Sequence, residues 1–224
     1  MTTKKNETLY IGTILTVIAS FLMGFIDAYT FLLQDEVFAS AQTGNLVSLS
    51  AKLFLGEWRE TMSHVWAFFG FVIGAFAGEA VIDRYQDRGM KKYSYYLLIQ
   101  TTLLFALALF QQQLTSAVML FSLGTLAGYE LTIFRKFRDT SVNNGIMTGN
   151  TRNLMGYLYQ VIFNKDSNAK AHLTNLAATV LIFMLGVGAG TLTIQINASY
   201  NLWAAFSISL LAFAWTTSHP ARSP

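Results

Sequence analysis

Residues 41–45, Ala-Gln-Thr-Gly-Asn, decide the fold, because residues 146–150, Ile-Met-Thr-Gly-Asn, repeat the motif in the second half of the chain. Each Thr-Gly-Asn follows a hydrophobic segment that carries one carboxylate, Asp27 in the first half and Glu130 in the second. Each also precedes a short apolar stretch and then a segment with regularly spaced glycines. A polar motif that is duplicated in an apolar chain indicates a substrate path between two structural repeats.

The composition favours a membrane protein. Of the 224 residues, 53% are hydrophobic and only 12% are charged, whereas soluble domains carry about 25% charged residues. We therefore expect a single membrane domain over residues 1–224, without a separate soluble domain. The first apolar run is too long for a cleavable signal peptide, and we expect it to remain as the first span.

The hydropathy pattern predicts an all-α integral membrane protein with about six transmembrane helices, each long enough to cross a hydrocarbon core of about 30 Å. The predicted spans are 9–33, 62–83, 93–112, 114–134, 171–194 and 199–217. Two shorter and more polar stretches, 44–56 and 149–163, follow the Thr-Gly-Asn motifs. Whether these two stretches span the membrane is open on hydropathy alone.

Basic residues cluster in the connections that six spans would place on one side of the membrane. The clusters are Lys4 and Lys5; Arg84, Arg88, Lys91 and Lys92; Arg135, Lys136 and Arg138; Lys165 and Lys170; and Arg222. With both termini in the cytoplasm, every cluster lies inside. The stretches 44–56 and 149–163 are then predicted to be re-entrant or broken helices. Three spans in each half would invert the second repeat (114–217) relative to the first (9–112).

Two further motifs extend the duplication. Residues 71–78, Phe-Val-Ile-Gly-Ala-Phe-Ala-Gly, match residues 183–190, Phe-Met-Leu-Gly-Val-Gly-Ala-Gly. Residues 23–25, Met-Gly-Phe, match residues 127–129, Ala-Gly-Tyr. Since glycines four residues apart share one helix face, we expect them to form helix-crossing surfaces. The predicted packing glycines are Gly70, Gly74, Gly78, Gly186 and Gly190.

The Thr-Gly-Asn motifs and the two carboxylates are the predicted substrate or ion path. Thr suits a helix N-cap, Gly allows close backbone approach, and Asn offers a donor and an acceptor. Helices that begin at mid-depth would direct their N–H groups towards an anion or a polar solute. The predicted path residues are Asp27, Thr43, Gly44, Asn45, Glu130, Thr148, Gly149 and Asn150, with Arg152 as a candidate anion contact.

The sequence leaves both structural and functional interpretations of these residues open. Each motif could be an ordinary helix cap at the membrane interface. The carboxylates could couple transport to protons or cations, because intramembrane carboxylates usually face a cavity or a partner. Alternatively, Glu130 could form a structural ion pair with Arg135 or Arg152. Glu79, close in sequence to Arg84, is predicted to pair with it at the interface.

Several function classes are disfavoured. The chain contains no cysteine, and its three histidines form no metal-binding spacing, so we predict no disulfide and no metal site. No catalytic motif is evident, and we therefore predict no catalytic residue, no cofactor and no enzymatic activity. The basic residues lie at helix ends, where membrane topology explains them, and we expect no nucleic-acid partner.

Residues 24–28, Gly-Phe-Ile-Asp-Ala, followed by residues 42–46, Gln-Thr-Gly-Asn-Leu, resemble the bacterial YoaK-like family, an uncharacterised family of small integral membrane proteins with a domain of unknown function. The second Thr-Gly-Asn and the glycine-rich fifth span fit the same family. The resemblance implies a multi-pass protein of the bacterial cell (inner) membrane and supplies no substrate. The chain departs from the family at residues 128–131, Gly-Tyr-Glu-Leu, where an amide-rich segment is usual, so Glu130 is less typical of the family.

The leading hypothesis is a transporter or channel for a small solute or ion, with its path at the interface of the two repeats. The alternative is a non-transporting scaffold, lipid-binding or assembly protein. The lipid bilayer and a small solute are the expected partners, and a homo-oligomer is open. The two cues to the solute's charge conflict, because carboxylates favour cations whereas helix N-termini favour anions.

Overall fold

The computed structural model describes residues 2–218, with side chains from Thr8 onwards. The predicted inner charge Arg222 lies outside the described residues, as do the side chains of Lys4 and Lys5. The helices are α1 (Thr2–Leu33), α2 (Gln42–Leu55), α3 (Trp58–Tyr85), the short 3-10 helix η1 (Gln86–Arg88), α4 (Lys91–Phe110), α5 (Ser116–Ile133), α6 (Met147–Ile162), α7 (Ala169–Ile196) and α8 (Ala198–Ser218).

Within residues 2–218, five helical segments are long and apolar enough to cross a membrane: Thr8–Leu33, Trp58–Arg88, Lys91–Phe110, Ser116–Ile133 and Ala169–Ile196. The sixth predicted span is the helix α8, which has 21 residues but is not among the five. The protein is therefore a helical protein of membrane type.

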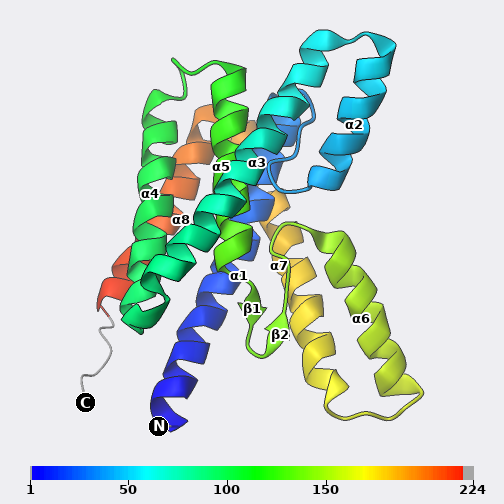
Figure 1. The fold of residues 1–224 in the computed structure, drawn as a ribbon, viewed down its shortest axis with the longest axis vertical. Helices are drawn as coiled ribbons and strands as arrows, with labels where there is room; N and C mark the ends of the chain where they lie inside the picture. Colours follow the sequence, from blue (N-terminus) through cyan, green and yellow to red (C-terminus); the bar gives the residue numbers. More distant parts are fainter. Residues whose placement is uncertain (1, 219–224) are drawn as a thin grey trace.

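The two stretches after the Thr-Gly-Asn motifs form α2 and α6, with 14 and 16 residues. At 1.5 Å per residue these helices are about 21 and 24 Å long, shorter than a hydrocarbon core of about 30 Å. Both begin near the middle of the molecule, and they run towards opposite ends (Figure 1). Each then leads through a short connection into a long helix, α3 or α7.

The long helices pack in pairs, α1 with α7, α3 with α5 and α4 with α8. Glycines allow the close crossings in the first two pairs. A Cβ atom on Gly24 of α1 would overlap the carbonyl oxygen of Phe183, and one on Gly186 of α7 would overlap that of Phe21. Because these contacts involve backbone atoms, neither position has room for a larger side chain.

The apolar core lies where α1, α4, α5 and α8 meet, and it includes Leu22, Leu104, Leu123 and Leu202. Large apolar side chains also cover the outside of the molecule, as Phe76, which is 78% exposed, illustrates. Soluble monomers rarely expose large apolar patches. An apolar exterior is the arrangement expected of helices that face lipid.

A small antiparallel hairpin, β1 (Lys136–Phe137) with β2 (Thr140–Ser141), follows α5 and was not predicted from the sequence. Its turn contains Arg138 at a positive φ of 54°. The hairpin lies against α1, where the Thr16 hydroxyl donates to the Lys136 carbonyl oxygen at 2.7 Å. The Arg138 N–H donates to the Thr13 hydroxyl at 3.0 Å.

Candidate functional site

The loops that precede α2 and α6 touch each other beside Asp27. The Ser40 N–H donates to Oδ1 of Asp27 at 3.0 Å, and the Ser40 hydroxyl lies 2.5 Å from Oδ2 of Asp27 and 3.0 Å from the carbonyl oxygen of Gly145. Asp27 is 4% exposed and Ser40 is fully buried. A buried carboxylate is thus held at the junction of the two loops by hydrogen bonds to its charged oxygens, as burial requires.

The asparagines of the two motifs hold these loops in the same way in both halves. The Asn45 side chain accepts from the Phe38 N–H at 3.0 Å and donates to the Phe38 carbonyl at 2.6 Å. The Asn150 side chain accepts from the Asn143 N–H at 3.0 Å and donates to the Asn143 carbonyl at 2.7 Å. Each partner lies seven residues before its asparagine. An amide matches both backbone groups of one residue because it combines an acceptor with donors.

A second contact also recurs in both halves, between each loop and the long helix that follows it. In the first half the Ser63 hydroxyl of α3 donates to Oδ2 of Asp35 at 2.8 Å. In the second half the Asn175 amide of α7 donates to the Thr140 hydroxyl at 2.9 Å. The loops are therefore anchored at their beginnings as well as at the starts of α2 and α6.

A cavity of about 530 Å³ opens beside this junction, between α1, α7 and the starts of α2 and α6. Asp27, Gly145, Thr148 and Thr191 contribute its polar lining, and the rest of its wall is apolar. Phe31, Phe38, Met147 and Phe183 are among the apolar lining residues. Its size and its few convergent polar groups are typical of sites for small molecules.

A row of polar side chains on α1 leads from the cavity towards the hairpin, and we call Thr16, Ser20 and Asp27 the polar seam. Their spacing of four and then seven residues places them on one helix face. Thr16 contacts the Lys136 carbonyl, as described above, and the buried Ser20 hydroxyl donates to Oδ1 of Asn144 at 3.0 Å. Thr16 and Asp27 are about 16 Å apart along the helix axis at 1.5 Å per residue.

The threonines of the two motifs do not act as the expected helix caps. The N-cap residues are Ala41 and Ile146, and neither makes a side-chain cap hydrogen bond. Thr43 lies exposed in the first turn of α2, next to the exposed Gly44, whereas Thr148 lines the cavity beside Gly149. The capping prediction is wrong because each helix begins one residue before its threonine, which therefore lies within the first turn instead of at the N-cap.

Glu130 is not brought together with Asp27. Its side chain is fully buried in α5 and does not line the cavity. No hydrogen bond to either of its carboxyl oxygens forms among the described residues, although the Gln100 side chain lies near it. Arg135 pairs with Glu79 at 3.0 Å rather than with Glu130. The predicted pairing of Glu79 with Arg84 is therefore wrong, because Arg135 comes close to Glu79 where α5 packs on α3.

The remaining predicted residues have no place in the cavity. Arg152 is exposed on α6, and the packing glycines lie at helix crossings. Gly74, for example, faces the carbonyl oxygen of Thr125, and Gly190 faces that of Phe25. Across the part of the chain that the structure describes, no three His, Asp or Glu side chains gather as a metal ion would require. Ser40, in contrast, was not predicted as a site residue. The only indication in the sequence was its position in the loop that precedes the first Thr-Gly-Asn motif.

Span-length helices, two half-length helices and a buried polar junction define a helical protein of membrane type. A family model described as "Protein of unknown function (DUF1275)" matches residues 15–215, and the chain belongs to this family. The expectation of an uncharacterised family is confirmed, and the YoaK-like name is consistent with the match without being part of its description. No curated protein and no solved structure matches the chain.

Proposed function

We propose that the protein is a membrane transporter for a small solute, and that the cavity at Asp27 is its binding site. The observation that carries the proposal is the position of this cavity. It adjoins the contact between Ser40 and Gly145, which join the two loops that precede α2 and α6. In transporters built from repeats, the substrate binds where broken helices from the two repeats converge near the membrane centre.

The proposed architecture is a pair of inverted repeats. The asparagine–loop and loop–helix contacts described above recur in both halves. The glycine crossings recur as well, because Gly128 of α5 faces the carbonyl oxygen of Phe71, just as Gly24 of α1 faces that of Phe183. The hairpin and the α6–α7 connection lie towards one end of the molecule, and the α2–α3 and α4–α5 connections lie towards the other (Figure 1). With the basic clusters inside, this arrangement supports opposite orientations of α2 and α6.

The lining of the cavity favours a solute with an apolar body and one cationic or hydrogen-bond-donating group. Aromatic side chains such as Phe31 and Phe183 provide faces that attract cations as well as apolar surface. Asp27 supplies the charge that a cation would meet, and Thr148 supplies a hydroxyl. The solute would compete with Ser40 for the oxygens of Asp27, and that competition would loosen the contact between the loops.

We further propose that the Ser40–Gly145 contact is the gate of an alternating-access carrier. In this proposal the closed contact would separate the cavity from the part of the polar seam that runs through Ser20 to Thr16. If the contact opens, the seam provides hydroxyl groups for a solute moving towards the hairpin. Motion of one repeat against the other would then expose Asp27 to each side in turn.

Single-cysteine labelling tests the inverted repeats, because the chain has no cysteine of its own. Glu57→Cys, after α2, and Asn164→Cys, after α6, are both at exposed positions. In intact cells a membrane-impermeant maleimide should label Glu57→Cys from outside, whereas Asn164→Cys should react only after the membrane is opened. Gln112→Cys and Arg88→Cys serve as outer and inner references. Labelling of the first two variants from the same side excludes the inverted arrangement.

Transport itself is tested in proteoliposomes with ethidium as the organic cation. The wild type should accumulate ethidium faster than empty vesicles, and Asp27→Asn should lower the initial rate at least tenfold. The exposed Glu57→Gln removes the same charge away from the cavity and should leave the rate unchanged. Equal rates for Asp27→Asn and the wild type would remove Asp27 from the mechanism.

The second candidate function is a non-transporting scaffold or assembly protein. One observation favours it, because both oxygens of Asp27 accept hydrogen bonds from Ser40 and a purely structural carboxylate would be paired in this way. In that case no organic cation in a panel stabilises the wild type relative to Asp27→Asn, although the substitution still lowers the unfolding temperature. The absence of enzymatic activity stays an expectation from the sequence.

A further inference from the structure

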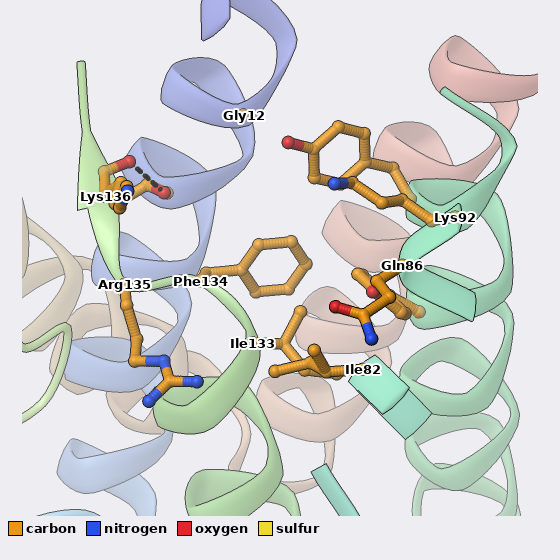
Figure 2. A pocket seen from close by; sticks show the side chains of 11 residues that line it. Gly12, Ile82, Gln86, Lys92, Ile133, Phe134, Arg135 and Lys136 are labelled. Carbon is orange, nitrogen blue, oxygen red and sulfur yellow. Dashed lines mark hydrogen bonds between the residues drawn. The ribbon is translucent and has the colours of Figure 1, made fainter. Parts of the chain in front are cut away.

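A second cavity, of about 260 Å³, lies where α1 passes the end of α3, η1, the start of α4 and the end of α5. It shares no lining residue with the cavity at Asp27. Figure 2 shows Lys136 and Arg135 on one side of it and Lys92 and Gln86 on the other, with Ile133 and Phe134 between them. The lining therefore joins segments that are far apart in the sequence.

The charge of this cavity has one sign. Its lining includes Lys92, Arg135 and Lys136, and no Asp or Glu. Arg135 is engaged by Glu79 outside the lining. Lys92 and Lys136 form no salt bridge with any residue that the structure describes. Two unneutralised ammonium groups on facing walls favour an anion between them.

The walls are apolar below this charged mouth, with a few polar groups that could orient a ligand. Ile82, Ile133 and Phe134 provide apolar surface, while Gln86 and Tyr93 provide an amide and a phenolic hydroxyl. Gly12 leaves room for that hydroxyl, since a Cβ atom there would lie 2.8 Å from the Tyr93 oxygen. The Lys92 ammonium lies 5.3 Å from the centroid of the Tyr93 ring, which keeps it beside the cavity.

The cavity lies at the ends of helices that are long enough to span a membrane. Lys92 is in the first turn of the span Lys91–Phe110, and Arg135 and Lys136 follow the span Ser116–Ile133. These ends carry the basic clusters, and the positive-inside rule therefore assigns them to the cytoplasmic surface. Phospholipid phosphates lie at the same depth, and basic pockets between transmembrane helices on this side bind anionic headgroups.

We propose that this cavity is a binding site for a phosphate group, with Lys92 and Lys136 as its two cationic ligands. The phosphate could belong to an anionic phospholipid or be free inorganic phosphate. The apolar walls beneath the charged mouth favour the phospholipid, because they would cover the glycerol and the upper acyl chains. Thr16, at the end of the proposed polar seam, also lines this cavity, but binding of the phosphate requires no movement of a solute along the seam. The bound phosphate would join the start of α4 to the segment that follows α5.

The test measures binding to the full-length protein in uncharged detergent by isothermal titration calorimetry. The probes are dioctanoyl-phosphatidylglycerol, dioctanoyl-phosphatidylcholine and inorganic phosphate. Each lysine near a membrane surface contributes about 1 kcal/mol to the binding of anionic lipid, which corresponds to about fivefold in affinity. Lys92→Gln and Lys136→Gln should therefore each weaken phosphatidylglycerol binding about fivefold, and the double variant about twenty-five-fold.

Lys91→Gln is the matched control, because it removes the same charge one residue away from a residue that lines the cavity. It should bind phosphatidylglycerol within about twofold of the wild type, and the charge-conserving Lys92→Arg should also keep most of the affinity. Circular dichroism and gel filtration check that each variant is folded. If the double variant is unfolded, the two single variants and Lys92→Arg provide the comparison.

The three probes identify the source of the phosphate. Binding of phosphatidylglycerol with weak binding of phosphatidylcholine and inorganic phosphate supports a lipid site. Lysine-dependent binding of inorganic phosphate without binding of phosphatidylglycerol supports the phosphate site and excludes the lipid. Phosphatidylglycerol binding that Lys91→Gln weakens as much as Lys92→Gln overturns the proposal, because the effect would then be one of surface charge. No lysine-dependent binding of any probe overturns it as well.

Discussion

Ser40 and Gly145 occupy the same position in two loops, five residues before Asn45 and Asn150, and they contact each other. The Ser40 hydroxyl lies 3.0 Å from the Gly145 carbonyl oxygen and 2.5 Å from Oδ2 of Asp27. A hydroxyl has one proton, so it cannot donate fully to both acceptors at once. The contact between the loops and the hydrogen bonding of Asp27 are therefore coupled through one side chain.

Ser40→Ala should destabilise the protein by about 1–3 kcal/mol, because it leaves a buried carboxylate oxygen without its hydroxyl donor. Thermal unfolding in detergent measures the change. Ser50→Ala, at an exposed position of α2, is the control and should unfold at the wild-type temperature. An unfolding temperature for Ser40→Ala that equals the control would mean that the hydroxyl does not stabilise Asp27.

Gly145→Ala should also destabilise the protein, by about 1–3 kcal/mol, because a Cβ atom there would overlap the Ser40 side chain. Gly156→Ala is the matched control within α6, since no atom lies within 4 Å of a Cβ at that position. Alanine in a helix interior is favoured over glycine by about 0.5–1 kcal/mol, so this control should unfold at the same or a higher temperature. If both variants behave alike, the loops do not pack as tightly as the structure indicates.

The sequence was sufficient to predict most helices, because hydropathy and length are local properties of each segment. The duplicated Thr-Gly-Asn also marked the starts of α2 and α6. The roles within the motif could not be predicted in the same way. Asn45 bonds Phe38, and Asn150 bonds Asn143, only because the preceding loops fold back, and loop conformation depends on tertiary contacts. Propensity favoured threonine as the cap, and the loop geometry gave the hydrogen bonds to asparagine instead.

Contacts between side chains that are far apart in the sequence were the hardest to predict from the sequence. Glu79 meets Arg135 because α3 packs on α5, and proximity in the sequence pointed to Arg84. Asp27 meets Ser40 because the chain turns back after α1. Glu130 resembles Asp27 in its position relative to the motif. It does not line the cavity, because it lies on a side of α5 that is buried in the protein interior. Equivalent sequence order therefore did not produce equivalent surroundings for the two carboxylates.

Asn45→Asp and Asn150→Asp should lower stability by similar amounts, about 1–3 kcal/mol each. Aspartate keeps the acceptor for the loop N–H but replaces the amide donor by an oxygen that faces a carbonyl. Thermal unfolding of both variants is compared with Asn153→Asp, which makes the same change at an exposed position of α6. A loss confined to one motif would contradict the equivalence of the two loops.

Gly186→Ala should weaken the crossing of α1 and α7, because the added Cβ would overlap the Phe21 carbonyl oxygen. Overpacking of this kind costs about 1–3 kcal/mol. Gly188→Ala changes the same helix two residues away, where a Cβ meets no atom within 4 Å, and should be neutral or stabilising. The midpoint of unfolding in a titration with sodium dodecyl sulfate measures the stability of both variants. Equal midpoints would show that α1 can shift away from α7 at little cost.

Glu130→Gln should not destabilise the protein, in contrast to Asp27→Asn. An unpaired carboxylate is costly to bury, and glutamine replaces it with a neutral group of the same shape. Asp27 instead accepts two hydrogen bonds from Ser40, and the Asp27→Asn substitution would set an amide donor against one of those donors. Unfolding temperatures of the two variants should therefore change in different directions, with Glu130→Gln at or above the wild type. A large loss of stability for Glu130→Gln would show that both carboxyl oxygens accept hydrogen bonds, because glutamine keeps only one acceptor oxygen.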